Sequence, residues 1–254
     1  MATTKRVNAD FLNLRNAPKT GAVISELPRA TPVTVTGPSP VVGWVAVKVG
    51  TGASTESGFV SEKLLRDPVS DTKEELMLVA STEWMRFDKG TGQEHQSPYF
   101  KFVGEMWGAL GLDLDGKDRD MPWSAAYISW CVRNAGGYTG FKFSASHSKY
   151  IVDGISKKLS GTAAPFGGFE IGDKKPELGD MVCQWRVNKM TYDNAVAAGS
   201  FKSHCDIVME VGDGFVRALG GNNNQTVGYK KYNLTSGGFL TDEKNVFAIL
   251  KNQK

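Results

Sequence analysis

The sequence predicts an α+β protein, in which a small β-rich module precedes a larger domain of helices packed on an antiparallel sheet. Residues 7–66 contain short strand patterns separated by closely spaced glycines and prolines. Residues 73–135 carry apolar side chains at helical spacing, and the chain from residue 179 onward is strand-like. Helices followed by antiparallel strands indicate a layered α+β fold. A length of 254 residues is sufficient for two domains.

The first 66 residues predict a small β-barrel or sandwich. The segments "TPVTVTG", "VVGWVAVKVG" and "SGFVSEKLL" are rich in β-branched side chains and are bounded by turn residues. Residues 1–66 carry eight Lys and Arg against four Asp and Glu, whereas the remainder of the chain carries 22 against 23. This basic excess either favours an anionic partner or forms a solvated face. The polar segment 67–72 predicts a linker.

The first module resembles a bacterial SH3-like domain. The resemblance is carried by "FLNLRNAPKTGAVISELPRATPVTV", "GWVAVKV" and "GFVSEKLL". The matching residues are Leu12, Leu14, Arg15, Pro18, Val23, Leu27, Gly43, Trp44, Gly58, Phe59, Val60 and Leu64. The resemblance implies an SH3-like β-barrel over residues 1–66 that binds cell-wall peptides or, alternatively, a spacer without a ligand.

Three helices are predicted at the start of the larger domain. The first, in "TKEELMLVASTEWMRFDKG", has Thr72 as its N-cap and Glu75 completing a capping box. The second, in "SPYFKFVGEMWGALG", has Ser97 as its cap and Pro98 at the first helical position. The third begins at Ser124 in "MPWSAAYISWCVRNAGG". Strands are expected after it in "GDMVCQWRV", "HCDIVMEVGDGFVRALGG", "TVGYKKYNL" and "NVFAILKN".

Ser124 lies at the head of an apolar stripe. Ser124, Tyr127, Ile128 and Cys131 are spaced i, i+3, i+4 and i+7, so they share one helix face. Two helical turns, about 10 Å, separate Ser124 from Cys131, which we place in the core. Unpaired N–H groups and the helix dipole favour developing negative charge near Ser124. The alternative is that Ser124 is simply an N-cap, a position where serine is strongly preferred.

His204 is a candidate partner for a nucleophile in the larger domain. It begins an apolar strand, in which alternation places His204 and Asp206 on one side and Cys205 on the other. The "GDG" turn returns the chain, so that Asn222 and Asn223 end within reach of His204. A histidine oriented by an amide or carboxylate and facing a nucleophile is the general form of a Ser/Cys–His–polar site.

The larger domain, placed at residues 73–254, resembles papain-like wall amidases and peptidases of the CHAP and NlpC type. The resemblance is carried by "PWSAAYISWCVRNAG", "ELGDMVCQWR", "HCDIVMEVGDG" and "ALGGNNNQTV". Within that group the chain most resembles domain of unknown function family 2272, through "EWMRFD", "PWSAAYISW", "SASHSKYI" and "HCDIVMEV".

This resemblance assigns roles to individual residues. Ser124 occupies the position of the nucleophilic cysteine, His204 that of the general base, and Asn222 that of the orienting residue. Asn223 and Asp206 are the alternatives to Asn222. The serine is either native to the family or an engineered replacement of cysteine, and the sequence does not separate the two. A serine hydroxyl is not ionised by a helix dipole and needs its base in hydrogen-bond contact.

Other candidates in the larger domain remain secondary. Trp123 is expected to line the cleft, and His147 in "SASHSKYI" either lines it as well or is a structural histidine at a helix start. Cys205 is a weaker candidate nucleophile, because alternation points it away from the side of His204.

No metal or cofactor is expected. The acidic residues of "DLDGKDRD" do not continue into an EF-hand glutamate, because Ser124 occupies that position, so we predict a solvated loop. These residues are Asp113, Asp115, Asp118 and Asp120. Three irregularly spaced cysteines predict reduced thiols and neither a disulfide framework nor a zinc site.

The sequence-based hypothesis is a peptidoglycan hydrolase that cleaves an amide bond in the bacterial cell wall. The alternative is a catalytically inactive wall-binding or structural protein. We expect a monomer. We also expect no binding to nucleic acid, because the sequence has no basic stripe with interleaved aromatic residues. No apolar run approaches the roughly 20 residues needed to span a bilayer. The start "MATTKRVNAD" does not predict a secretory signal. We therefore expect synthesis in the cytoplasm and action at the wall or periplasm after other export, injection as an antibacterial effector, or phage-type lysis.

Overall fold

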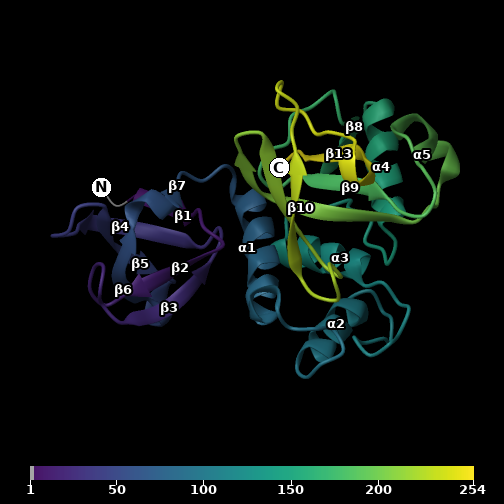
Figure 1. The fold of residues 1–254 in the computed structure, drawn as a ribbon. Coiled ribbons are helices and arrows are strands. Elements are labelled where there is room, and N and C mark those ends of the chain that lie inside the picture. The colour runs from purple at the N-terminus through teal and green to yellow at the C-terminus, as the bar shows by residue number, and fades with distance from the viewer. Residues whose placement is uncertain (1–2) are drawn as a thin grey trace. The chain divides into compact units, whose positions relative to one another are not determined.

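The computed structural model describes residues 3–254, and the chain divides into two compact units, Met1–Thr82 and Glu83–Lys254. The boundary lies inside helix α1 (Asp71–Arg86), C-terminal to the segment 67–72 for which the sequence predicts a linker. Both units contain an antiparallel sheet, and the chain has five α-helices within the described residues, so the α+β class is confirmed (Figure 1).

The first unit is built on one seven-stranded antiparallel sheet in the order β3-β2-β6-β5-β4-β1-β7 (Figure 1). Its strands are β1 (Thr3–Val7), β2 (Phe11–Arg15), β3 (Val23–Pro28), β4 (Pro32–Pro38), β5 (Trp44–Val49), β6 (Glu56–Ser61) and β7 (Leu65–Arg66). Alternate side chains of these strands form one apolar core that includes Leu12, Leu14 and Leu27. The outermost strands β3 and β7 do not pair with each other in residues 3–254, so the sheet is open and the closed SH3-like barrel stays a prediction.

Helix α1 begins two residues earlier than a Thr72 cap would place it, at Asp71. The backbone N–H of Glu74 donates to the Ser70 carbonyl, and the N–H of Lys73 donates to Ser70 Oγ at 3.3 Å. Ser70 therefore caps the helix instead of Thr72, because its hydroxyl reaches the donors of the first turn. The carboxylate of Glu74, which is fully buried, accepts hydrogen bonds from both terminal nitrogens of Arg66. The N–O distances are 2.6 and 2.8 Å.

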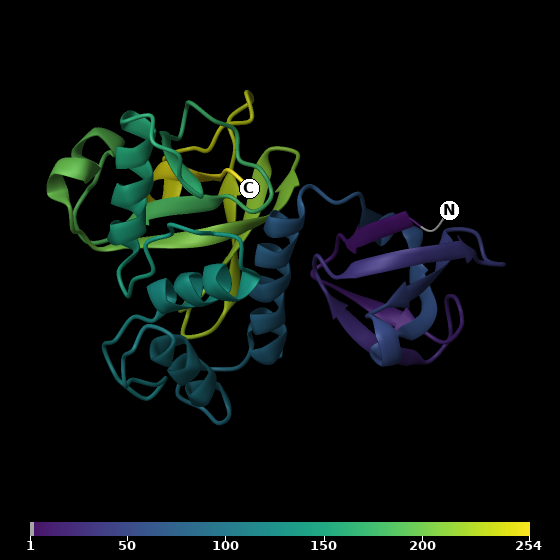
Figure 2. The same cartoon turned by 180° about the vertical axis from the view of Figure 1, so that it is seen from behind.

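The second unit is a six-stranded antiparallel sheet in the order β12-β11-β10-β9-β13-β8. Its strands are β8 (Phe166–Glu170), β9 (Met181–Trp185), β10 (Ser203–Gly212), β11 (Phe215–Gly220), β12 (Gly228–Asn233) and β13 (Val246–Asn252). Its other helices are α2 (Tyr99–Gly108), α3 (Ser124–Ala135), α4 (His147–Leu159) and α5 (Tyr192–Ala198). Helix α3 contacts β10 and β11, and α4 contacts β8 and β10 (Figure 2). The strands β1 and β8 and the helix α5 are additions to the elements that the sequence predicts.

Two helix starts differ from the predicted caps. Ser124 is the first residue of α3, Trp123 occupies the N-cap position, and no side chain caps the helix. Ser124 is therefore not a capping residue, which leaves its hydroxyl available to other partners. Pro98 similarly occupies the N-cap position of α2 rather than its first helical position.

Close packing of α4 on the sheet depends on a glycine of β8. A Cβ atom on Gly168 would lie 2.5 Å from Ile155 Cγ1 and 2.7 Å from the Ile155 backbone nitrogen. Any larger residue would push α4 off β8, and the first residue of α4 is His147. The site described below thus depends on this contact through the position of α4.

We expect Gly168→Ala to lower the stability of the protein by about 1–3 kcal/mol, because the added methyl group overpacks the α4–β8 contact. Gly172→Ala is the matched control, since a Cβ atom there meets nothing within 4 Å. The midpoints of urea denaturation of the two variants test this expectation. Equal midpoints would show that α4 can shift without cost.

Candidate active site

A pocket of about 830 Å³ in the second unit brings together side chains from α3, α4, β10 and the loop after β11. Ser124, His147, His204 and Asn222 line it. Ser124 and His147 are the first residues of α3 and α4, and His204 is the second residue of β10, so the N-terminal ends of three elements form one site. Of the other predicted site residues, Trp123, Cys205, Asp206 and Asn223 lie outside the pocket lining.

Ser124 and His147 form a hydrogen-bonded pair. Ser124 Oγ lies 2.7 Å from His147 Nε2, and the serine and histidine side chains belong to residues that are only 6% and 4% exposed. The serine stands in the first turn of α3, whose leading N–H groups have no intrahelical acceptor. A hydroxyl, an imidazole in contact with it and N–H groups without an intrahelical acceptor are therefore adjacent, which is the set of groups that a nucleophile, a base and an oxyanion site require.

Burial keeps His147 neutral. Desolvation, reinforced by the charge of His204, holds the pKa of His147 well below its usual range. A neutral imidazole can accept the Ser124 proton, whereas an imidazolium cannot. His147 is thus in the protonation state that a general base needs at neutral pH.

Tyr150, one turn after His147 on α4, is the hydrogen-bond partner of the second nitrogen of that imidazole. Its hydroxyl is hydrogen-bonded to His147 Nδ1. Burial raises the pKa of Tyr150 well above its usual value, and a hydrogen bond to Cys205 acts in the same direction. The neutral tyrosine can donate to Cys205 while accepting from an Nδ1–H group. That arrangement leaves Nε2 of His147 as the acceptor for Ser124.

His204 has a carboxylate partner of its own. His204 Nε2 lies 2.8 Å from Asp206 Oδ1, and both residues are buried. Asn223 Nδ2 also donates to Oδ1 at 3.1 Å, while Lys230 Nζ (3.4 Å) and the Tyr232 hydroxyl bond to Oδ2. Burial would raise the pKa of Asp206, but His204 and Lys230 outweigh it and hold that pKa well below its usual range. Asp206 is therefore an ionised, fully hydrogen-bonded carboxylate.

The orienting residue differs from the one that the sequence favours. Asn222 lines the pocket, but the hydrogen-bond partner of His204 in residues 3–254 is Asp206, the alternative that strand alternation places on the same side. Asn222 lies in a bend with φ 53°, a left-handed conformation, beyond the end of β11. Asn223 does not bond His204 directly but donates a hydrogen bond to Asp206, the partner of His204.

The two histidines are neighbours, and each has a different partner. Their ring centroids are 5.2 Å apart. Desolvation lowers the pKa of His204, and the Asp206 carboxylate opposes that shift. The sequence interpretation assigns the base to His204, but the hydrogen bond to Ser124 belongs to His147. The signal that could have identified His147 is its position at a helix start in "SASHSKYI".

Trp123 and Cys205, the remaining candidates from the sequence, are buried in the core and do not line the pocket. Trp123 is 1% exposed, stacks on Phe87 with centroids 5.6 Å apart, and donates to Glu94, so it anchors the start of α3. Cys205 is fully buried beside Cys183, with the sulfurs 3.3 Å apart. Within residues 3–254, no group of His, Cys, Asp and Glu side chains could hold a metal ion.

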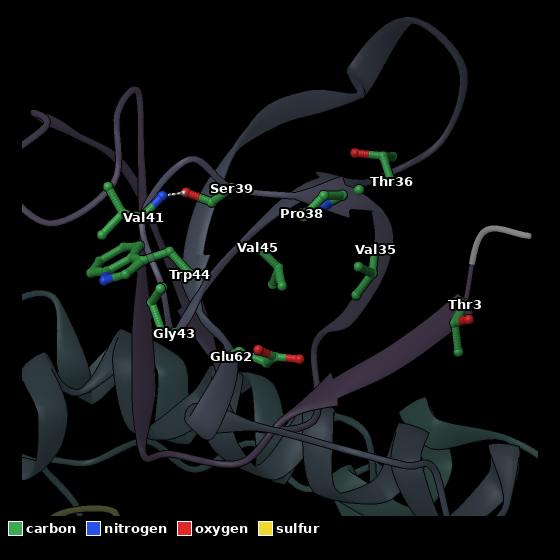
Figure 3. Close-up of a pocket in the computed structure, with 12 residues that line it drawn as sticks. Thr3, Val35, Thr36, Pro38, Ser39, Val41, Gly43, Trp44, Val45 and Glu62 are labelled. Carbon is green, nitrogen blue, oxygen red and sulfur yellow. Dashed lines mark hydrogen bonds between the residues drawn. The ribbon is translucent and has the colours of Figure 1, made fainter.

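The first unit has a pocket of its own, with a volume of about 580 Å³. Figure 3 shows Trp44 on one side and Val35 on the other, with Val45 between them and Glu62 below in this view. Val42, at its rim, is 98% exposed. The pocket combines an aromatic ring, aliphatic side chains and one carboxylate.

The comparisons with known proteins identify the second unit. The family model described as "Uncharacterized protein conserved in bacteria (DUF2272)" matches residues 84–251. One similar solved structure is that of NlpC2 from Trichomonas vaginalis, with 13% identity and a TM-score of 0.32 over 99% of this chain and 73% of that chain. No curated protein matches the sequence. No helix in residues 3–254 is long and apolar enough to cross a membrane.

We expect Asp206→Asn to lower the pKa of His204 further, because the carboxylate is the group that opposes desolvation of the imidazolium. NMR titration of the His204 ring protons measures this shift. Asp213→Asn, which removes an exposed carboxylate from the β10–β11 turn, is the control and should leave the titration unchanged. A raised His204 pKa in Asp206→Asn would contradict the assigned ion pair.

Proposed function

The chain belongs to the DUF2272 family of bacterial proteins, and on this premise we propose that its second unit hydrolyses an amide bond in the bacterial cell wall. The observation that carries the proposal is the hydrogen bond between Ser124 Oγ and His147 Nε2 in a pocket that also contains the buried His204–Asp206 pair. A papain-like arrangement of nucleophile and base, with serine in place of cysteine, accounts for these contacts.

In this proposal Ser124 attacks the carbonyl carbon and His147 takes the hydroxyl proton. The carbonyl oxygen gains negative charge and is held by N–H groups of the first turn of α3. When the C–N bond breaks, His147 returns the proton to the leaving amine, and an acyl-serine forms. Water then attacks the acyl-serine and gives one proton to His147. The ester C–O bond breaks, the acid is released, and His147 returns that proton to Ser124 Oγ, which restores both residues.

The geometry favours a working serine over an inert replacement of cysteine. A thiol at a helix N-terminus can ionise with help from the dipole, but a hydroxyl needs a base in contact. The distance of 2.7 Å between Ser124 and His147 meets that need. Tyr150 supports it, because it bonds the opposite nitrogen of the same ring.

The first unit serves, in this proposal, as an SH3-like module that binds the wall, with residues 1–66 forming the binding domain and residues 73–254 the catalytic domain. The pocket around Trp44 is its ligand site. We further propose a monomer that is made in the cytoplasm and reaches the wall or periplasm after other export, injection or lysis.

Incubation of purified peptidoglycan with the protein should release fragments with new amino groups, and mass spectrometry of the fragments identifies the bond. Ser124→Ala and His147→Ala should each lower the rate by at least about a hundredfold, because each removes a reacting group. Ser124→Cys should retain activity. Because burial holds the pKa of His147 well below its usual range, the wild-type rate should persist below the pH at which an unperturbed histidine is protonated, about pH 6.5.

His95→Ala is the matched control, since His95 is an exposed loop residue outside the pocket. His204→Ala tests the base assignment. A greater loss in His204→Ala than in His147→Ala would return the base role to His204. Full activity of Ser124→Ala, with folding intact, would refute the nucleophile, and pelleting with walls without turnover by any form would favour an inactive wall-binding protein.

Trp44→Ala should weaken pelleting of the full chain with purified walls several-fold, because it removes the largest apolar surface of the pocket in the first unit. Glu62→Gln provides a second variant that leaves the apolar surface intact. Ile24→Ala removes an exposed apolar side chain elsewhere in the unit and serves as the control. Unchanged pelleting of both pocket variants would assign wall binding to another surface.

A further inference from the structure

Two basic residues face each other at the mouth of the active-site pocket. The backbone N–H of Arg186 donates to the Lys202 carbonyl at 2.8 Å. This bond extends the β9–β10 register, in which Ser203 pairs with Trp185 and His204 pairs with Gln184, by one residue. Arg186 and Lys202 are therefore directly opposite each other, and opposite residues of an antiparallel pair project to the same face.

That face is the one that carries His204. Alternate residues of a strand share a face, so Lys202 lies on the side of His204, and Arg186 on the side of Gln184. Both basic residues are exposed, and both line the pocket that contains Ser124. Desolvation lowers the pKa values of His147 and His204, and the charge of Arg186 acts in the same direction.

The two charges lack acidic partners. Neither side chain forms an ion pair or hydrogen bond within residues 3–254, and Asp120 alone is acidic among the described lining residues. Like charges placed directly opposite each other in a sheet are destabilising. A pair that costs stability and has no internal partner is suited to a ligand of opposite charge.

The backbone after Arg186 is held in a costly conformation. Val187 has φ 66° and is 76% exposed, and the N–H of Asn188 donates to the Arg186 carbonyl at 2.8 Å across it. A three-residue turn whose central residue is β-branched and has a positive φ is a strained conformation. The turn directly follows Arg186, one residue beyond the end of β9, and so fixes the backbone from which the guanidinium projects.

We propose that Arg186 and Lys202 bind a carboxylate of the substrate, so that the enzyme cleaves peptide amide bonds that have a free carboxylate near the scissile bond. The inference rests on the proposed hydrolase function. An arginine beside a lysine matches a carboxylate, since the planar guanidinium can bind it in a bidentate manner while the ammonium group adds charge. The pair lies on the same pocket as Ser124, which places the carboxylate close to the attacked bond.

Calorimetric titration of the full chain carrying Ser124→Ala tests binding without turnover. One probe is the peptide L-Ala-γ-D-Glu-L-Lys-amide, whose only carboxylate is the α-carboxylate of its glutamyl residue. The second probe is the same peptide with that carboxylate converted to a carboxamide. We expect the acid to bind about tenfold more tightly than the amide, and added salt to reduce this ratio.

Arg186→Gln and Lys202→Gln should each remove most of this preference, while their melting temperatures should not fall, because the like-charge contact is relieved. Lys142→Gln, an exposed lysine outside the pocket, is the charge-matched control and should keep the preference. Equal binding of acid and amide, or a preference that survives both pocket substitutions, would overturn the proposal. Displacement by inorganic phosphate without any preference between the peptides would also overturn it, because it would indicate a general anion site.

Turnover of wall fragments by the chain with Ser124 intact separates this proposal from the proposed function. A carboxylate preference in binding without any turnover would leave the anion site standing and refute the hydrolase. Turnover that is equal for acid and amide substrates and insensitive to Arg186→Gln would leave the hydrolase standing and refute the carboxylate site.

Discussion

The buried carboxylate of Asp206 organises the site of this protein. An ionised group without contact to solvent is costly to bury, and it is tolerated only where surrounding donors replace its hydration. Asp206 obtains these donors from His204, Asn223, Lys230 and Tyr232. They come from β10, β12 and the loop after β11, so the same set of bonds that satisfies the charge also fixes the strand that presents His204. Because each donor loses its acceptor if one strand slips, the network resists a change of register.

The second histidine depends on packing rather than on charge. His147 is the first residue of α4, which approaches β8 closely over Gly168. Its environment is apolar enough to keep it neutral, whereas His204 has an anion beside it. Two imidazoles with centroids 5.2 Å apart thus have different surroundings, and this difference allows them different tasks. Mutual repulsion of two imidazolium ions would oppose simultaneous protonation, so the neutral state of one supports the function of the other.

The serine at the start of α3 fits this design. A hydroxyl gains little from the helix dipole alone, and His147 supplies the contact that it needs. Tyr150 and the buried Cys205 lie behind the imidazole, away from the pocket lining, and restrict its hydrogen-bonding choices. The basic pair that lines the pocket favours, in the proposed reaction, an anionic substrate. Desolvation lowers the pKa values of both histidines, and the charge of Arg186 acts in the same direction. In the proposed reaction, recognition of the anion and proton transfer are therefore electrostatically linked.

Much of this protein follows from local sequence patterns. Alternation along β10 placed His204 and Asp206 together, and helical spacing located α3 with Ser124 at its head, because both are properties of a single element. The family was also readable from short motifs around these residues. The choice between His147 and His204 as the partner of Ser124, and between Asn222 and Asp206 as the partner of His204, was decided only in three dimensions. These choices depend on how closely α4 packs on the sheet and on where the loop after β11 turns. Both features arise from contacts between segments that are far apart in the chain.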